Sequence, residues 1–113
     1  MKVCIVIPAH NEGQFLTACL ESICLQTLAP KRVIVVNDHS SDNTYEIAQG
    51  FAEKHSFIRA INHRSSSLHM PGSKVVKAFN YGLEQLDLAY DVLLKLDADI
   101  LLPENYLECI CTH

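Results

Sequence analysis

With 113 residues, the chain has room for one domain, and its 49% hydrophobic content is enough for a core and argues against disorder. The formal net charge is −4 and no run of lysines or arginines occurs, which argues against a general surface for nucleic acid or anionic membranes. An anionic ligand would therefore need local positive charge, from a metal ion or from a few placed basic residues.

The first apolar run ends at Pro8, so it is too short for a signal-peptide core or a membrane span. The five cysteines are an odd number without metal-like spacing. Cys19 and Cys24 fall in an apolar helical pattern, and Cys109-x-Cys111 lacks a second cysteine pair. We expect reduced thiols in a cytoplasmic protein, with no membrane segment in this chain. This expectation leaves open whether a longer parent protein associates with a membrane.

Short β-branched runs alternate along the chain with longer apolar patterns of helical spacing. The short runs, which predict buried strands, are residues 3–7, 33–36, 57–61 and 92–96. The first and third predicted helices cover residues 12–26 and 73–86. The second begins with a capping box of Asn43 and Glu46, and the last has Pro103 in its first turn with Glu104 beside its positive end.

The alternation predicts an α/β fold, a three-layer αβα Rossmann-like parallel sheet with helices on both faces. Ligands of such sheets bind beyond the carboxyl ends of the strands. Polar segments follow all four predicted strands, at residues 8–12, 37–42, 62–73 and 97–99. The sequence therefore places its polar chemistry at one edge of the sheet.

Two carboxylates, Asp97 and Asp99, follow the fourth predicted strand. If the backbone stays extended there, its two-residue period aims both side chains to the same side. Two like charges that close repel each other unless a cation or a hydrogen-bonded ligand lies between them. Carboxylate oxygens suit Mg²⁺ or Mn²⁺, which completes its shell with phosphate and water. The alternative is a solvated turn, and the position directly after an apolar strand favours the metal.

Asp38 follows the second predicted strand. An ionised carboxylate only accepts hydrogen bonds. It therefore suits a base that presents a ring N–H, as uracil and guanine do, and rejects cytosine at that position. The alternative is a turn or helix-capping aspartate, which is the role that we assign to Asp42.

Further polar side chains follow the first strand and begin the third helix. His10 is a catalytic base, a metal ligand or a loop histidine without function, and Asn11 and Glu12 also fit a helix start. Lys74 and Lys77 can supply positive charge to an anion or remain solvated surface lysines. The sequence has neither Gly-x-Gly-x-x-Gly after its first strand nor a Walker A motif, which argues against dinucleotide and P-loop sites.

Three of these segments, taken in order, resemble the N-terminal half of family 2 glycosyltransferases with the GT-A fold. The family's opening strand, "(V/I)IP-x-(Y/H)NE", resembles Val6-Ile7-Pro8-Ala9-His10-Asn11-Glu12. Its "VVDDGSxD" segment resembles Val35-Val36-Asn37-Asp38-His39-Ser40-Ser41-Asp42, and its "DxD" motif resembles Leu96-Asp97-Ala98-Asp99. The resemblance covers essentially the whole chain. It identifies residues 1–113 as a nucleotide-diphospho-sugar-binding domain, the N-terminal part of a longer glycosyltransferase.

The family transfers a sugar from a nucleoside diphosphate, usually UDP, with inversion at the anomeric carbon and a divalent cation. The resemblance implies a hexosyltransferase-like enzyme that uses Mg²⁺ or Mn²⁺. It also implies that Pro8 and Ala9 line the base pocket and that Asp38 holds the uracil N–H. Asp97 would lie near the ribose, and Asp99 would bind the metal on the diphosphate.

The chain departs from the family pattern at several positions. Asn37 replaces the first aspartate of the usual pair, and His39 stands where glycine is common, so the turn there is expected to differ. The family's "GKAxALNxG" helix fits only at its end, which puts the lysines out of register. We keep Asn11, Glu12 and Lys77 as candidate nucleotide-sugar-binding residues.

The family's general base lies in its second half. After Asp99 the only carboxylates are Glu104 and Glu108, both in the last predicted helix, so we expect the chain to lack the base and to bind donor without transferring sugar. One alternative is a non-catalytic nucleotide-sugar-binding module. Another is a related nucleotidyltransferase, which would usually carry a Gly-rich, basic loop after its first strand. A receiver domain fits poorly, because the first strand ends in Pro8-Ala9 and not in an acidic pair.

Overall fold

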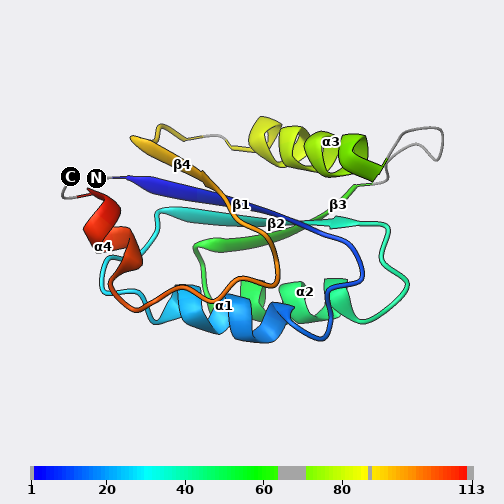
Figure 1. The fold of residues 1–113 in the computed structure, drawn as a ribbon, viewed down its shortest axis with the longest axis horizontal. Coiled ribbons are helices and arrows are strands. Elements are labelled where there is room, and N and C mark those ends of the chain that lie inside the picture. Colours follow the sequence, from blue (N-terminus) through cyan, green and yellow to red (C-terminus); the bar gives the residue numbers. More distant parts are fainter. Residues whose placement is uncertain (1, 64–70, 87, 112–113) are drawn as a thin grey trace.

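The computed structural model describes residues 2–63, 71–86 and 88–111 (Figure 1). Residues 64–70 of the predicted polar segment, and the side chain of Lys74, lie outside the described part. Strands and helices alternate through the described residues. They are β1 (Val3–Ala9), α1 (Leu16–Cys24), β2 (Arg32–Asp38), α2 (Thr44–Lys54), β3 (Ile58–His63), α3 (Pro71–Glu84), β4 (Val92–Lys95) and α4 (Tyr106–Cys111).

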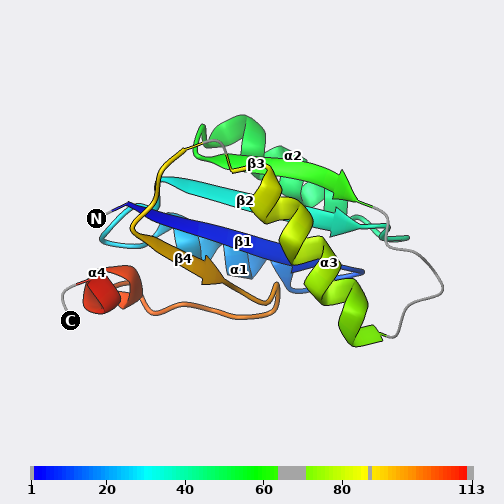
Figure 2. The ribbon, with the colours of Figure 1, turned by 90° about the horizontal axis from the view of Figure 1, so that it is seen from above.

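The strands form one parallel sheet in the order β3-β2-β1-β4. Helices α1 and α2 cover one face of this sheet, and α3 crosses the other face over β1 and β2 (Figures 1 and 2). The predicted three-layer α/β fold is therefore confirmed. Because the strands are parallel, the loops that follow β1, β2 and β4 meet at one edge (Figure 2).

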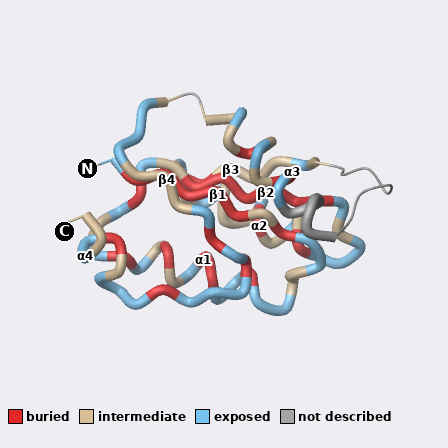
Figure 3. Tube along the Cα trace, turned by 45° about the horizontal axis from the view of Figure 1, so that its top comes forward, coloured by how far each residue is buried: buried red, intermediate tan, exposed pale blue. Residues whose placement is uncertain are grey.

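Buried side chains lie on both faces of the sheet, and Figure 3 shows them concentrated in the strands between the helical layers. Along β1, Ile5 packs toward α1 and α2, whereas Val6 packs toward α3. The smaller cluster under α3 also contains Ile34, Val36 and Ala78. Burial on both faces explains why β1 and β2 are continuous apolar runs rather than alternating ones.

The start of α1 and the capping of α2 differ from the predicted ones. Helix α1 begins at Leu16 rather than near residue 12, and a turn in which Phe15 N donates to Glu12 O at 3.0 Å precedes it. The predicted capping box of α2 is wrong, since Asn43 makes no side-chain capping hydrogen bond. Instead Asp42 Oδ1 accepts a hydrogen bond from Thr44 N at 3.0 Å. The capping role expected of Asp42 is thus observed.

Helix α4 is short and is anchored by a buried glutamine that follows α1. Gln26 is 8% exposed, and its Nε2 donates to Pro103 O at 2.6 Å while its Oε1 accepts from Leu107 N at 2.9 Å. Pro103 and Glu104 lie in the turn before α4 and not in its first turn as predicted, because Tyr106 N donates to Pro103 O at 3.0 Å. None of the helices that the structure describes has the length and apolar character of a membrane span.

Helix α3 lies close to the sheet at Gly82. A Cβ atom at Gly82 would lie 2.7 Å from a methyl carbon of Val6 and 2.7 Å from one of Val36. These side chains are buried and β-branched, so neither can turn aside easily. By contrast, a Cβ at Gly50 in α2 would meet no atom within 4 Å.

We predict opposite effects for the same substitution at these two glycines. Gly82→Ala should lower the free energy of unfolding by about 1–3 kcal/mol, because overpacking outweighs the gain in helix propensity. Gly50→Ala should raise it by up to about 1 kcal/mol, because only helix propensity changes. Urea unfolding of both variants measures the difference, and equal shifts in one direction would contradict the close packing of α3.

Candidate functional site

An open pocket of about 280 Å³ lies where the carboxyl ends of β1, β2 and β4 meet. The described residues that line it come from the carboxyl ends of β1 and β2, from the loops after β1 and β4, and from α3. They are Pro8, Ala9, His10, Glu12, Asp38, Ala78, Asp97, Ala98 and Asp99. The structure thus brings together all the predicted site residues except Asn11 and Lys77. The rule that ligands of such sheets bind beyond the carboxyl ends of the strands predicts this edge, and the parallel sheet explains why the residues converge.

Asn11 holds the loop after β1 against the loop after β2. Its side-chain Oδ1 accepts hydrogen bonds from Ser41 N at 2.8 Å and from Ser41 Oγ at 3.2 Å. Its backbone N donates to Ser40 Oγ at 2.9 Å. Asn11 is therefore a scaffold residue of the two loops in this structure, and its side chain is not among the described pocket lining.

Asp42 and Thr44 make the second set of bonds between the same loops. Thr44 is fully buried, and its Oγ1 accepts from Glu12 N at 2.9 Å, while Gly13 N donates to Asp42 Oδ2 at 3.0 Å. The hydrogen bond from the Thr44 hydroxyl, followed by those from backbone N–H groups, holds the pKa of Asp42 below its ordinary value. A side chain at Gly13 would collide with Asn43. The two loops therefore form one packed unit that carries Glu12 and Asp38.

His10 joins these loops from the pocket side. Its Nδ1 lies 2.6 Å from Asp38 O, and because a carbonyl only accepts, Nδ1 carries the proton. Its Nε2 lies 3.4 Å from Asn11 Nδ2, which can donate to it. The sequence left His10 without a partner, but in the structure it bonds to the backbone of Asp38, the last residue of β2.

His39 adopts a left-handed conformation with φ of 52°. A backbone in this region favours glycine, the residue that is common at this position in the family. A non-glycine residue pays about 1–2 kcal/mol for this conformation. The hydrogen bonds between the two loops hold the turn against that cost.

Asp97 and Asp99 lie in a turn rather than in an extended segment. Ile100 N donates to Asp97 O at 3.1 Å, which closes the turn, so the extended geometry predicted from their spacing is wrong. Both aspartates nevertheless line the pocket, with the buried Ala98 between them. The turn therefore brings both carboxylates to one pocket, as the two-residue spacing predicted, although the backbone is not extended.

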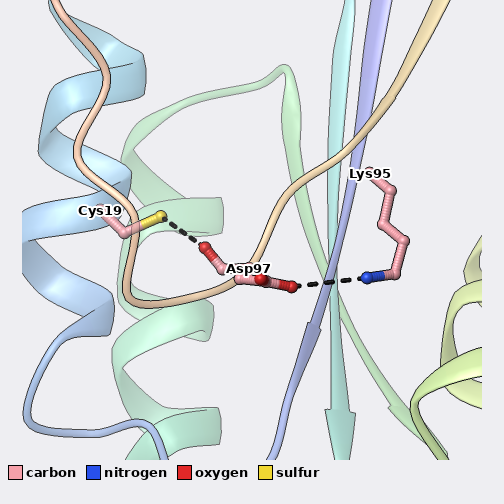
Figure 4. Close-up of polar contacts among 3 residues, drawn as sticks. All are labelled: Cys19, Lys95 and Asp97. Atoms are coloured by element: carbon pink, nitrogen blue, oxygen red, sulfur yellow. Dashed lines mark hydrogen bonds and ion pairs between the residues drawn. The ribbon is translucent and has the colours of Figure 1, made fainter. Parts of the chain in front are cut away.

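Two side chains from outside this turn contact Asp97 (Figure 4). The buried Cys19 thiol of α1 lies 3.9 Å from Asp97 O, and burial raises the pKa of Cys19 to about 12, so the thiol keeps its proton and donates. On the other side, Lys95 Nζ lies 3.4 Å from Asp97 Oδ1. Sequence reasoning missed Lys95, although its two-residue spacing from Asp97 at the strand end was a usable signal.

The pocket is acidic. Burial, and after it the charges of Asp99, Asp42 and Asp97, raise the pKa of Glu12, while His10 acts in the opposite direction. The described residues contain no group of three or more histidines, cysteines or carboxylates arranged to hold a metal ion. The donor set fits a hard cation held by one or two carboxylates, with a diphosphate and water as its other ligands.

Lys77 and Asn37 lie beside the pocket. Lys77 belongs to α3, next to the pocket residue Ala78, but is not among the described lining. Asn37 Nδ2 donates to Asn62 Oδ1 at 2.9 Å, joining β2 to β3. The register Asn37↔Asn62 explains this contact, which the sequence alone did not reveal.

The chain is similar to three known proteins, one in sequence and two in structure. The E. coli (strain K12) protein "Uncharacterized glycosyltransferase YibD" is 30% identical over 99 residues, which are 88% of this chain and 27% of that protein. The crystal structure of S. aureus TarS 1-349 in complex with UDP is 25% identical, with a TM-score of 0.74, and the match covers 99% of this chain and 31% of that one. The mannosyltransferase PcManGT from Pyrobaculum calidifontis, solved with GDP-Man and Mn²⁺, shares the fold at 24% identity and a TM-score of 0.69, over 90% of this chain and 28% of that one.

The chain therefore spans less than a third of the length of each of these proteins. The sequence model of one family, described as "Glycosyl transferase family 2", matches residues 4–111. Because that match covers nearly all of the chain, the chain belongs to glycosyl transferase family 2.

Proposed function

We propose that the pocket binds a nucleoside-diphosphate sugar, with a UDP-sugar as the favoured donor, for inverting glycosyl transfer. The observation that carries this proposal is the convergence of Asp38, Asp97 and Asp99 on one pocket. The family match supports glycosyl transfer over nucleotidyl transfer. The presence of UDP in the TarS structure supports a uridine nucleotide. Pro8 and Ala9 form the part of the lining where we place the base.

Asp38 would select the base. It is 7% exposed and lines the pocket, and the bond from His10 to its carbonyl fixes its backbone. A carboxylate held in this way accepts a hydrogen bond from the ring N–H of uracil. Cytosine presents a bare ring nitrogen at the same position and would face the carboxylate lone pairs. The proposal therefore predicts selection against cytidine nucleotides.

Asp99 would be the protein ligand of a divalent cation, Mg²⁺ or Mn²⁺, and Asp97 would lie near the ribose. Burial raises the pKa of Glu12, and the negative charges of Asp99 and Asp97, which add to this effect, favour a cation at this edge of the pocket. When bound, such a cation stabilises the negative charge of the departing diphosphate. The described residues hold and orient the donor in this proposal, and none of them is assigned as the general base.

The first test concerns the metal. Asp99→Ala should weaken Mn²⁺-dependent UDP binding at least about tenfold, since even residues behind a metal ligand change affinity by that much. Glu53→Ala, an exposed carboxylate of α2, is the matched control and should bind as the wild type does. Calorimetric titration of UDP with and without Mn²⁺ gives both affinities. Tight, Mn²⁺-dependent binding by Asp99→Ala would remove Asp99 from the proposed site.

The second test concerns the base. Wild-type protein should bind UDP more tightly than CDP by about 1.5–3 kcal/mol, the net value of a hydrogen bond to a charged group. Asp38→Ala should lose this preference, and Asp38→Asn should lose less, because its amide oxygen can rotate to accept the same bond. Competition titrations with the two nucleotides measure the difference. Equal wild-type affinities for UDP and CDP would contradict the assignment of Asp38.

A further inference from the structure

Lys95 places a positive charge beside the acidic pocket. It is the last residue of β4, and its Nζ lies 3.4 Å from Asp97 Oδ1, on the side of Asp97 away from α1 (Figure 4). The Lys95 side chain is 41% exposed and that of Asp97 is 65% exposed. The pair is therefore open to solvent and to a ligand in the pocket that Asp97 lines.

The pocket needs such a charge if its ligand is an anion. Four carboxylates line it, and the described lining contains neither lysine nor arginine. Those carboxylates are Glu12, Asp38, Asp97 and Asp99. A nucleoside diphosphate without metal would meet like charges here, while a cation alone would be attracted. The strength of the repulsion and of the attraction depends on how much of the carboxylate charge is offset by basic groups outside the pocket lining.

The backbone of Asp97 is fixed, so the ion pair has a defined place. The Cys19 thiol and Ile100 N both donate to Asp97 O, and Leu96 and Ala98 on either side are buried. The carboxylate therefore points from a fixed backbone toward Lys95. Because both partners are exposed, the ion pair is weak, and Lys95 offsets only part of the charge of Asp97.

We propose that Lys95 sets the charge balance of the donor pocket, offsetting Asp97 so that the pocket accepts an anionic nucleotide and binds cations less strongly. This inference rests on the proposed function for the identity of the anion. It makes Lys95 a positioning residue that acts through Asp97.

The test measures one variant with an anion, a cation and a neutral probe at low ionic strength, on the order of 20 mM, where charge effects are least screened. Lys95→Gln should bind metal-free UDP about two- to fivefold more weakly and Mn²⁺ alone about two- to fivefold more tightly, the range for an exposed ion pair. Its affinity for uridine should not change. Lys95→Arg should restore wild-type values for all three probes.

Lys54→Gln is the matched control, since it removes the same charge from the exposed end of α2, outside the pocket lining. It should bind all three probes as the wild type does. Equal UDP and Mn²⁺ affinities for Lys95→Gln and wild type would overturn the inference, as would a shift of both in the same direction. Wild-type protein that binds Mn²⁺ but no nucleotide would refute the proposed function, and the Mn²⁺ comparison would still decide the role of Lys95. Wild-type protein that binds neither would overturn both.

Discussion

Hydrogen bonds tie the loop after β1 to the loop after β2, and the positions of Glu12 and Asp38 in the pocket depend on them. Asn11 and Thr44 form hydrogen bonds between the two loops, and His10 forms another one on the pocket side. Each bond is worth only about 0.5–1.5 kcal/mol, but together they hold two segments roughly thirty residues apart in sequence as one body. The left-handed backbone conformation at two non-glycine positions is tolerated because the surrounding hydrogen bonds hold the two loops in place.

The parallel sheet supplies the frame in which these loops can meet. Its two central strands, β1 and β2, are buried on both faces, and α3 approaches them closely because Gly82 has no side chain. Ala78, one turn earlier on α3, then reaches the pocket wall beside Asp38. Close packing of one helix is thus connected to the shape of the site, since a helix displaced from Gly82 would also carry Ala78 away from the pocket.

The strands and the polar edge of the sheet could be predicted from sequence because both follow from local pattern. Continuous β-branched runs indicate burial on two faces, and the residues after them, such as Asp38 and Asp99, must then lie at the carboxyl edge. The role of Asn11 could not be predicted, because its partner Ser41 lies on another loop and only the folded register brings the two together. The turn after Asp97 was missed for a similar reason, since its geometry depends on Cys19 and Ile100 as well as on the motif itself.

Charge connects the proposed donor site to the composition of the chain. A protein with a net charge of −4 that binds an anion at a pocket lined by four carboxylates must offset that charge locally. A divalent cation at Asp99 would neutralise charge where the diphosphate lies, but only when it is bound. Lys95 offsets part of the charge of Asp97 without a bound ligand, because it belongs to the same strand end. The two aspartates of the motif would then differ in function because only Asp97 has a lysine beside it. The partly neutralised Asp97 suits a hydroxyl group of the donor. Asp99 lies near the negative charge of Glu12 and suits a metal ion.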